Sequence, residues 1–290
     1  MPAHALILMT SMNPMNSLHK FFLSTITTLS LTTLVQQVHA DQLADIQQKG
    51  EIVIGVLGTA EPFSFIDPKT RELVGYEIDI GKDLAQALGV KPVFKQLAVA
   101  ARIPELQQGH VDILAAALAI TPDRQEQIDF SIPTLITGQK ILVSKQSGIS
   151  GIAQLEGKKL VTIKGGTQEA NAKKAIAQAN VVSFDNAPQA FLALQQGKAE
   201  GMVDDESGLV GVLNKAGSKA ENFTILPERI STTQVAIGIK KHEPALLAAI
   251  NSALLQAETR GEAGKWFFQW YGPTTQHGFS ERDFTWSAPN

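Results

Sequence analysis

Short apolar runs alternate with amphipathic stretches along the chain from about residue 50 onward. The run at 51–57 is almost wholly apolar, which is typical of a strand buried on both faces of a parallel sheet. After a loop, residues 79–88 carry apolar side chains at helical spacing, and Gly89 follows them as a stop signal. This alternation of strand and helix predicts an α/β architecture.

The same alternation predicts the remaining elements. Further strands are expected at 91–97, 112–120, 140–145, 159–164, 181–184, 201–205 and 235–240. Helices are expected at 104–108, 167–179, 188–196, 208–216 and 244–260. The aromatic side chains of segment 264–271 are interpreted as core packing rather than as a ligand cage.

The strand and helix pattern restarts near residue 145, and its last strand and helix read as elements that return to the first part of the chain. We therefore predict two lobes. Lobe 1 is discontinuous and comprises 41–143 plus 235–290, and lobe 2 comprises 144–234.

The first 40 residues differ in composition from the rest of the chain. Lys20 is their only charged side chain, an apolar, Thr-rich run follows it, and small residues precede Asp41. This predicts a secretory signal peptide at 1–40, cleaved after Ala40, with translation starting at Met1 or Met15. A membrane anchor is the alternative, although the apolar run is shorter than the ~20 residues needed to span a bilayer.

Charge and composition narrow the choice of partner. The chain has 44% hydrophobic and 18% charged residues and a formal net charge of -3. This balance argues against nucleic acid or an anionic membrane as the main partner. The sequence has no cysteine, so we expect no disulfide, no lipidated N-terminal cysteine and no thiolate zinc site. The six histidines show no metal-binding spacing, and we predict neither a metal nor a cofactor.

A cation follows the predicted strand 112–120. Thr121 is a plausible N-cap and Pro122 a plausible first helical residue, so Arg124 falls in the first turn of a helix. A cation there opposes the helix dipole, and a bound anion would compensate it. A guanidinium can hold a carboxylate with two parallel hydrogen bonds. The alternative is a surface ion pair with Asp123 or a nearby glutamate.

Two further segments lie at the carboxyl ends of predicted strands, where ligands bind in open α/β sheets. Gly165 and Gly166 follow a strand and open a helix, which makes a modest anion site or a plain turn. Asp204 and Asp205 end another strand and would suit an ammonium group, or else cap the next helix. Together with Arg124, these groups could hold opposite ends of a zwitterion.

The chain also resembles the polar amino-acid branch of the periplasmic solute-binding proteins, family 3, from about Asp41 to Tyr271. The matching motifs are Pro62-Phe63-Ser64, GYEIDI at 75–80, ITPDRQEQIDFS at 120–131, GGTQEA at 165–170, and Asp205 after an apolar strand. The segments 102–104, 261–263 and 265–267 are similar to glutamate/aspartate-binding members. The resemblance implies a type II periplasmic binding protein fold with two lobes. Each lobe is expected to have a central mixed sheet flanked by helices, and the ligand to lie in the inter-lobe cleft.

The resemblance also implies roles for individual residues. Arg124 is expected to hold the ligand α-carboxylate, supported by the backbone at Ala119 and Thr167. Asp205 is expected to pair with the α-amino group, helped by the carbonyl of Ala117.

Other positions would form the rest of the pocket. Thr167 and Gln168 are expected to line its lobe 2 side, and Phe63 its wall. Arg102 matches a position that helps to hold the side-chain carboxylate in acidic amino-acid binders.

The chain departs from its relatives at four pocket positions. Ala117 and Ala119 replace the Ser or Thr of many members, and Ala60 replaces a common aromatic platform. Leu57 replaces the Arg of acidic and the Asp of basic amino-acid binders. These changes predict a more apolar side-chain pocket.

The function that the resemblance implies is a periplasmic binding component of an ABC-type importer. It would be a monomer that captures an acidic or amide L-amino acid by hinged lobe closure and delivers it to an inner-membrane permease. The alternatives are a neutral or apolar ligand, a ligand-sensing module, or a periplasmic cyclohexadienyl-type dehydratase. A dehydratase would need a general acid, for which Glu61, Glu169 and Glu206 are the candidates.

Overall fold

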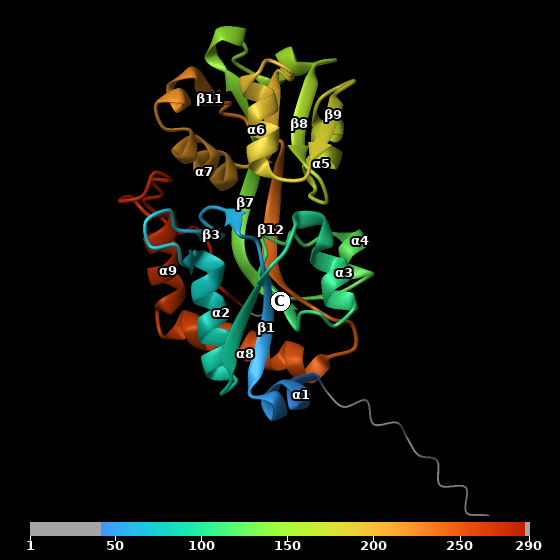
Figure 1. Ribbon diagram of the computed structural model, residues 1–290, viewed down its shortest axis with the longest axis vertical. Coiled ribbons are helices and arrows are strands. Elements are labelled where there is room, and N and C mark those ends of the chain that lie inside the picture. Colours follow the sequence, from blue (N-terminus) through green and yellow to red (C-terminus); the bar gives the residue numbers. More distant parts are fainter. Residues whose placement is uncertain (1–41, 288–290) are drawn as a thin grey trace, which may run out of the picture. The chain divides into compact units, whose positions relative to one another are not determined.

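The computed structural model describes residues 42–287, and Figure 1 shows a mixed α/β arrangement of strands and helices. The signal peptide predicted at 1–40 lies outside the described residues. The strands are β1 (Glu51–Val56), β2 (Thr59–Ala60), β3 (Ser64–Ile66), β4 (Leu73–Val74), β5 (Lys91–Gln96), β6 (Ile113–Leu114), β7 (Asp129–Ser144), β8 (Lys159–Ile163), β9 (Asn180–Phe184), β10 (Gly201–Asp205), β11 (Phe223–Ile225) and β12 (Ser231–Ile239). The α-helices are α1 (Gln42–Lys49), α2 (Tyr76–Ala87), α3 (Arg102–Gln107), α4 (Pro122–Gln125), α5 (Gln168–Ala175), α6 (Ala187–Gln195), α7 (Glu206–Ala216), α8 (Pro244–Thr259) and α9 (Glu262–Tyr271).

One mixed sheet of nine strands connects most of these elements. Its order is β5-β1-β6-β12-β7-β10-β8-β9, and β11 also pairs with β7. The pairs β1–β5, β1–β6, β8–β9 and β8–β10 are parallel, whereas β12 and β7 pair antiparallel with their neighbours. Because β7 pairs with both β12 and β10, the strands predicted to form two separate sheets are joined into one. The predicted mixed α/β fold class is confirmed.

The buried apolar side chains form clusters on either side of this β7–β12 connection. One cluster joins β1, α2, α8 and α9, with Ile54, Ile80 and Ile250 fully buried in it. Other clusters form around β8, β10 and α6, and include Val161 and Met202. Figure 1 shows the corresponding helices beside these strands. The lobe boundaries at 143/144 and 234/235 stay a prediction.

The apolar run at 112–120 is the clearest error of the sequence analysis. Only Ile113 and Leu114 form strand β6, and Ala117 has a left-handed backbone with φ 49°. The run is apolar because Ala115, Ala116 and Leu118 are fully buried, not because it continues the sheet. Beyond β6, Ala119 forms an isolated bridge to Val235 of β12, and the carbonyls of Ala116, Ala117 and Ala119 accept hydrogen bonds from arginine side chains.

Several predicted boundaries also shift. Helix α3 begins at Arg102 and places Pro104 in its first turn, where a missing N–H still costs no helical hydrogen bond. Strand β7 begins at Asp129, well before the predicted Lys140, and β12 begins at Ser231. Within residues 42–287, no helix is long and apolar enough to cross a membrane.

The aromatic side chains of α9 pack as predicted. Tyr271 and Phe267 are buried and their rings stack at 5.3 Å, and Phe63 meets the edge of Tyr271 at 6.2 Å. The chain after α9 continues this packing, because Trp286 is 2% exposed and its Nε1 donates to the Thr134 carbonyl of β7. The C-terminal segment is therefore part of the first core cluster.

Candidate functional site

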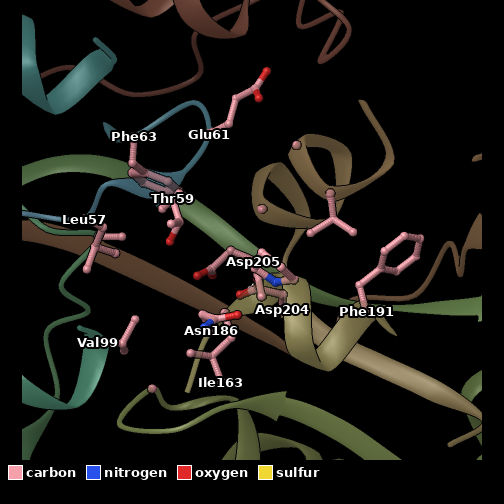
Figure 2. A pocket seen from close by; sticks show the side chains of 18 of the residues that line it. Leu57, Thr59, Glu61, Phe63, Val99, Ile163, Asn186, Phe191, Asp204 and Asp205 are labelled. Carbon is pink, nitrogen blue, oxygen red and sulfur yellow. Dashed lines mark hydrogen bonds between the residues drawn. The ribbon is translucent and has the colours of Figure 1, made fainter. Parts of the chain in front are cut away.

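A cavity of about 660 Å³ is the principal candidate site, and its size falls within the range of small-molecule pockets. Every residue predicted for the site lines it: Leu57, Ala60, Phe63, Arg102, Ala117, Ala119, Arg124, Thr167, Gln168 and Asp205. Figure 2 shows Asp204 and Asp205 in the middle of this lining, with Leu57 and Val99 on one side and Phe191 on the other. The structure thus brings the predicted residues together, and their roles stay predictions.

Arg124 is held in place by its own helix turn. The Thr121 hydroxyl accepts a hydrogen bond from the Arg124 backbone N–H at 3.3 Å, and Pro122 opens the helix, which confirms the predicted cap. The Arg124 side chain is buried and donates through Nη1 to Ala119 O (2.9 Å) and through Nη2 to Gly165 O (3.0 Å). It therefore contacts carbonyls of the cavity rather than pairing with Asp123 at the surface. Burial lowers the pKa of the guanidinium, and the charge of Asp205 opposes this shift.

The Thr121 cap gives a first prediction. Replacing Thr121 with alanine removes the hydroxyl acceptor and is expected to lower the free energy of unfolding by about 1 kcal/mol. Urea denaturation followed by circular dichroism would measure this loss. Because the Arg124 side chain keeps its two carbonyl partners, ligand affinity should change far less than stability. An unfolding free energy equal to that of the parent protein would contradict the capping role.

Arg102 is almost wholly occupied by the backbone. Its side chain is 3% exposed, and Nε donates to Val99 O at 2.8 Å. Nη1 donates to the Ala116 and Ala117 carbonyls at 2.7 and 2.9 Å, and Nη2 donates to Gly165 O at 3.1 Å. A guanidinium has five N–H donors, so these four bonds leave one for any other partner. The Arg102 side chain thus mainly stabilises the backbone of the cavity wall.

The two arginines share one acceptor, the Gly165 carbonyl of the predicted glycine turn. Gly165 has φ +85°, and a Cβ atom added there would lie 2.6 Å from the Ala100 Cα. Only glycine fits this approach, because the neighbouring atoms belong to the backbone of the opposite wall. The glycine turn therefore serves as a point of contact between the two walls of the cavity.

The acidic side of the cavity is formed by β10. Asp204 is buried and accepts from Gln168 Nε2 (2.9 Å) and from the Asp205 N–H (2.8 Å). Asp205 precedes helix α7 without making a side-chain cap, and its Oδ1 is buried with no hydrogen-bond partner among the described residues. Burial, followed by the charge of Asp204, raises the pKa of Asp205 above the usual carboxyl value, and Arg102 and Arg124 oppose the shift. The arrangement favours a cationic partner for Asp205.

Sequence reasoning missed much of the remaining lining. Val99, Ile163, Phe191 and Val212 add apolar surface, and Lys215 adds a cation. Among the described residues, no group of three or more His, Cys, Asp or Glu side chains could hold a metal ion. The lining residues that were missed carry no local motif, because they come together only when the chain has folded.

The three glutamates considered as general acids occupy different places. Glu61 lines the cavity, accepts from Asn214 and lies 3.8 Å from Lys215 Nζ. Glu169 instead bonds Lys173 and Ser183. Glu206 lies beside a second, smaller cavity and pairs with Lys140 and Arg229. Glu61 is consequently the one member of this trio that lines the candidate site.

Comparison with known proteins places this chain in a family. The chain is 31% identical over 234 residues to the ABC transporter glutamine-binding protein GlnH of Bacillus subtilis (strain 168), covering 79% of this chain and 84% of that protein. It is 28% identical over 240 residues to the glutamate/aspartate import solute-binding protein of Salmonella typhimurium, covering 79% of each chain.

Solved structures give the same result. An ancestral arginine-binding protein bound to arginine matches with a TM-score of 0.72 and 34% identity, covering 77% of this chain and 99% of that one. A structure described as an ancestral arginine-binding protein bound to glutamine matches at 35% identity with a TM-score of 0.72, covering 77% of this chain and 98% of that one. Residues 52–273 match the family model, and this chain belongs to the bacterial extracellular solute-binding proteins, family 3.

Proposed function

We propose that this protein captures a single polar L-amino acid in the cavity and delivers it to an ABC-type importer. The observation that carries the proposal is the presence of Arg124 and Asp205, with opposite charges, in the lining of one cavity. An amino acid is a zwitterion, so its two charged ends match these two groups. Relatives named for binding glutamine, and glutamate or aspartate, support the same substrate class.

The α-carboxylate would bind at Arg124. Two of the five donors of this guanidinium bond the Ala119 and Gly165 carbonyls, which leaves three N–H groups for a ligand. Charge-assisted hydrogen bonds of this kind are shorter and stronger than neutral ones. The left-over donors therefore suit a carboxylate, and Thr167 lies in the same lining.

The α-ammonium group would bind at Asp205. The Oδ1 atom of this residue is buried and has no hydrogen-bond partner within residues 42–287, and such atoms in native proteins usually bond a ligand or water. The Ala117 carbonyl lies in the same lining and accepts from Arg102, which leaves a second lone pair for the ligand.

The ligand side chain would be an amide rather than an acid. A second carboxylate would need a second buried cation with free donors. Arg102 already spends four of its five N–H groups on carbonyls. The two lysines of the lining, Lys215 and Lys219, are exposed, with Lys215 Nζ 3.8 Å from Glu61. Leu57, Ala60 and Phe63 add apolar surface to the same cavity. An uncharged polar side chain such as that of glutamine meets these conditions best.

Capture would end in closure of the cavity walls. The connecting strands β7 and β12 run from one set of core clusters to the other, and a hinge needs only a few residues that change φ and ψ. A ligand that touches both walls favours the closed form through the contacts it makes only there. The importer would then recognise the closed protein, in the periplasm after removal of residues 1–40.

A thermal-shift screen of the purified protein against the common amino acids tests the proposal. A ligand that binds the folded state stabilises it by about 2.7 kcal/mol at a concentration of 100 times its Kd. We expect L-glutamine to give the largest rise in Tm and L-glutamate a smaller one. If no amino acid raises Tm, the proposed function is wrong.

Proton release gives a second prediction. Because the pKa of Asp205 is raised, part of its population is protonated in the free protein near neutral pH, and an ammonium ligand would ionise it. We expect L-glutamine to bind with net proton release and more tightly as the pH rises, as calorimetry in buffers of different ionisation enthalpy would show. In Asp205→Asn the part of this release that comes from Asp205 should disappear along with most of the affinity. The exposed surface pair Asp83–Arg260 supplies the control Asp83→Asn, which should leave both unchanged.

A further inference from the structure

A buried carboxylate lies behind the wall of the cavity and does not line it. Glu77, in the first turn of α2, is 1% exposed. Its Oε1 and Oε2 atoms both accept from the backbone N–H of Ala117, at 2.8 and 3.0 Å. The structure thus directs a buried negative charge at one peptide group of the site.

The opposite side of that peptide group is held by a positive charge. The Ala116 carbonyl, which shares the peptide plane with the Ala117 N–H, accepts from Arg102 Nη1 at 2.7 Å. The peptide unit 116–117 therefore lies between a carboxylate and a guanidinium, and rotation of its plane would break bonds to both.

This grip explains a backbone conformation that alanine rarely adopts. Ala117 has φ 49°, and a left-handed residue other than glycine persists only where its surroundings determine it. The two bonds of Glu77 and the bonds of Arg102 supply those surroundings. The conformation also sets the course of the chain to Ala119, whose carbonyl positions Arg124.

The charge of Glu77 is poised to change near neutral pH. Burial raises its pKa to about 7, while the Ala117 hydrogen bond and the charge of Arg102 oppose the shift. Tyr76 and Tyr271 are buried nearby. Burial is the main cause that raises the pKa values of their hydroxyl groups, and the charge of Glu77 also raises them. Below its pKa the protonated carboxyl makes a weaker, neutral bond to the Ala117 N–H.

We propose that Glu77 is a positioning residue that fixes the peptide 116–117 and so sets the alignment of Ala117 and Arg124 for the ligand. This inference rests on the proposed function for its effect on affinity. Its structural part, the carboxylate grip on the Ala117 N–H, is independent of any ligand.

The substitution Glu77→Gln tests the proposal with L-glutamine as the probe. The amide oxygen can still accept from Ala117, but the bond loses its charge, and affinity should fall roughly fivefold above neutral pH. In the parent protein, affinity should also decline as the pH falls through about 7, the value to which burial raises the pKa of Glu77. That part of the pH profile should be missing in the variant, whereas any contribution from Asp205 should remain in both. Equal affinity of parent and variant at every pH would overturn the proposal.

Glu258→Gln is the matched control. Glu258 also accepts from a backbone N–H, that of Trp286, and pairs with an arginine, Arg282, but it does not line the cavity. This variant should keep the parent affinity and pH profile, so that a general effect of losing a carboxylate is separated from the positioning effect.

A ligand-free measurement keeps the two proposals distinguishable. By NMR, the Ala117 amide proton and the Glu77 carboxyl carbon should titrate with a common midpoint in the parent protein, and the Ala117 shift should not titrate in Glu77→Gln. If no amino acid binds the parent protein, the proposed function fails while this measurement still decides the grip. An Ala117 amide that ignores the titration of Glu77 would refute the positioning role.

Discussion

Replacing Arg124 with alanine is expected to lower the affinity for L-glutamine by roughly ten- to a hundredfold. Lost hydrogen bonds to a charged group cost about 1.5–3 kcal/mol, and each 1.4 kcal/mol is about tenfold in Kd. The guanidinium is buried, and its hydrogen-bond partners within the described residues are carbonyls. Carbonyls accept hydrogen bonds and cannot donate to a carboxylate, so they cannot replace the guanidinium in the alanine variant. Isothermal titration calorimetry would measure the change directly.

Arg260→Ala is the matched control for Arg124→Ala. Arg260 pairs with Asp83 at 2.8 Å, its side chain is 46% exposed, and it does not line the cavity. Exposed ion pairs contribute little, so this variant should bind L-glutamine as the parent does. If both variants bind equally well, the carboxylate site is elsewhere.

Replacing Gly165 with alanine is expected to weaken binding by at least about tenfold. The added Cβ would lie 2.6 Å from the Cα and 2.8 Å from the N of Ala100, and backbone atoms cannot rotate out of the way as a side chain can. The turn must therefore retreat from the opposite wall, which breaks the bonds from Arg102 and Arg124 to the Gly165 carbonyl. The walls could then no longer approach each other closely enough to enclose a ligand.

Gly157→Ala separates this clash from simple backbone strain. Gly157 has φ +66°, but nothing lies within 4 Å of the Cβ that alanine would add. Both substitutions place alanine at positive φ and should cost stability, on the order of 1 kcal/mol. Only Gly165→Ala should also lose affinity, and a matching loss in Gly157→Ala would show that the contact with Ala100 is irrelevant.

The sequence predicts those parts of the fold and site that depend on neighbours along the chain. Thr121 and Pro122 predict the start of α4, because a cap and its helix turn lie within four residues. The apolar run at 51–57 predicts β1, because a strand buried on both faces needs apolar side chains throughout. The candidate residues from both predicted lobes line one cavity. The sequence could predict this because several of them follow strands, and ligand sites in open α/β sheets lie at strand carboxyl ends.

The parts that were missed depend on partners far apart in the chain. The 112–120 run reads as a strand because burial and strand pairing leave the same apolar pattern. Nothing near Arg102 indicates that four carbonyls, one of them at position 165, would take up its donors. Glu77 offered one overlooked signal, since it is a charged residue between the buried Tyr76 and Ile78, and such residues need a partner.

The position of β12 has a consequence for the order in which the protein can fold. This strand, residues 231–239, lies between β6 and β7, both of which are synthesised earlier. Until it emerges, the facing edges of β6 and β7 have no strand between them, and exposed edges invite wrong pairing. The nine-stranded sheet is therefore completed by its last-synthesised strand, β12, which inserts between two earlier strands. A nascent chain shorter than about 230 residues therefore cannot complete the sheet.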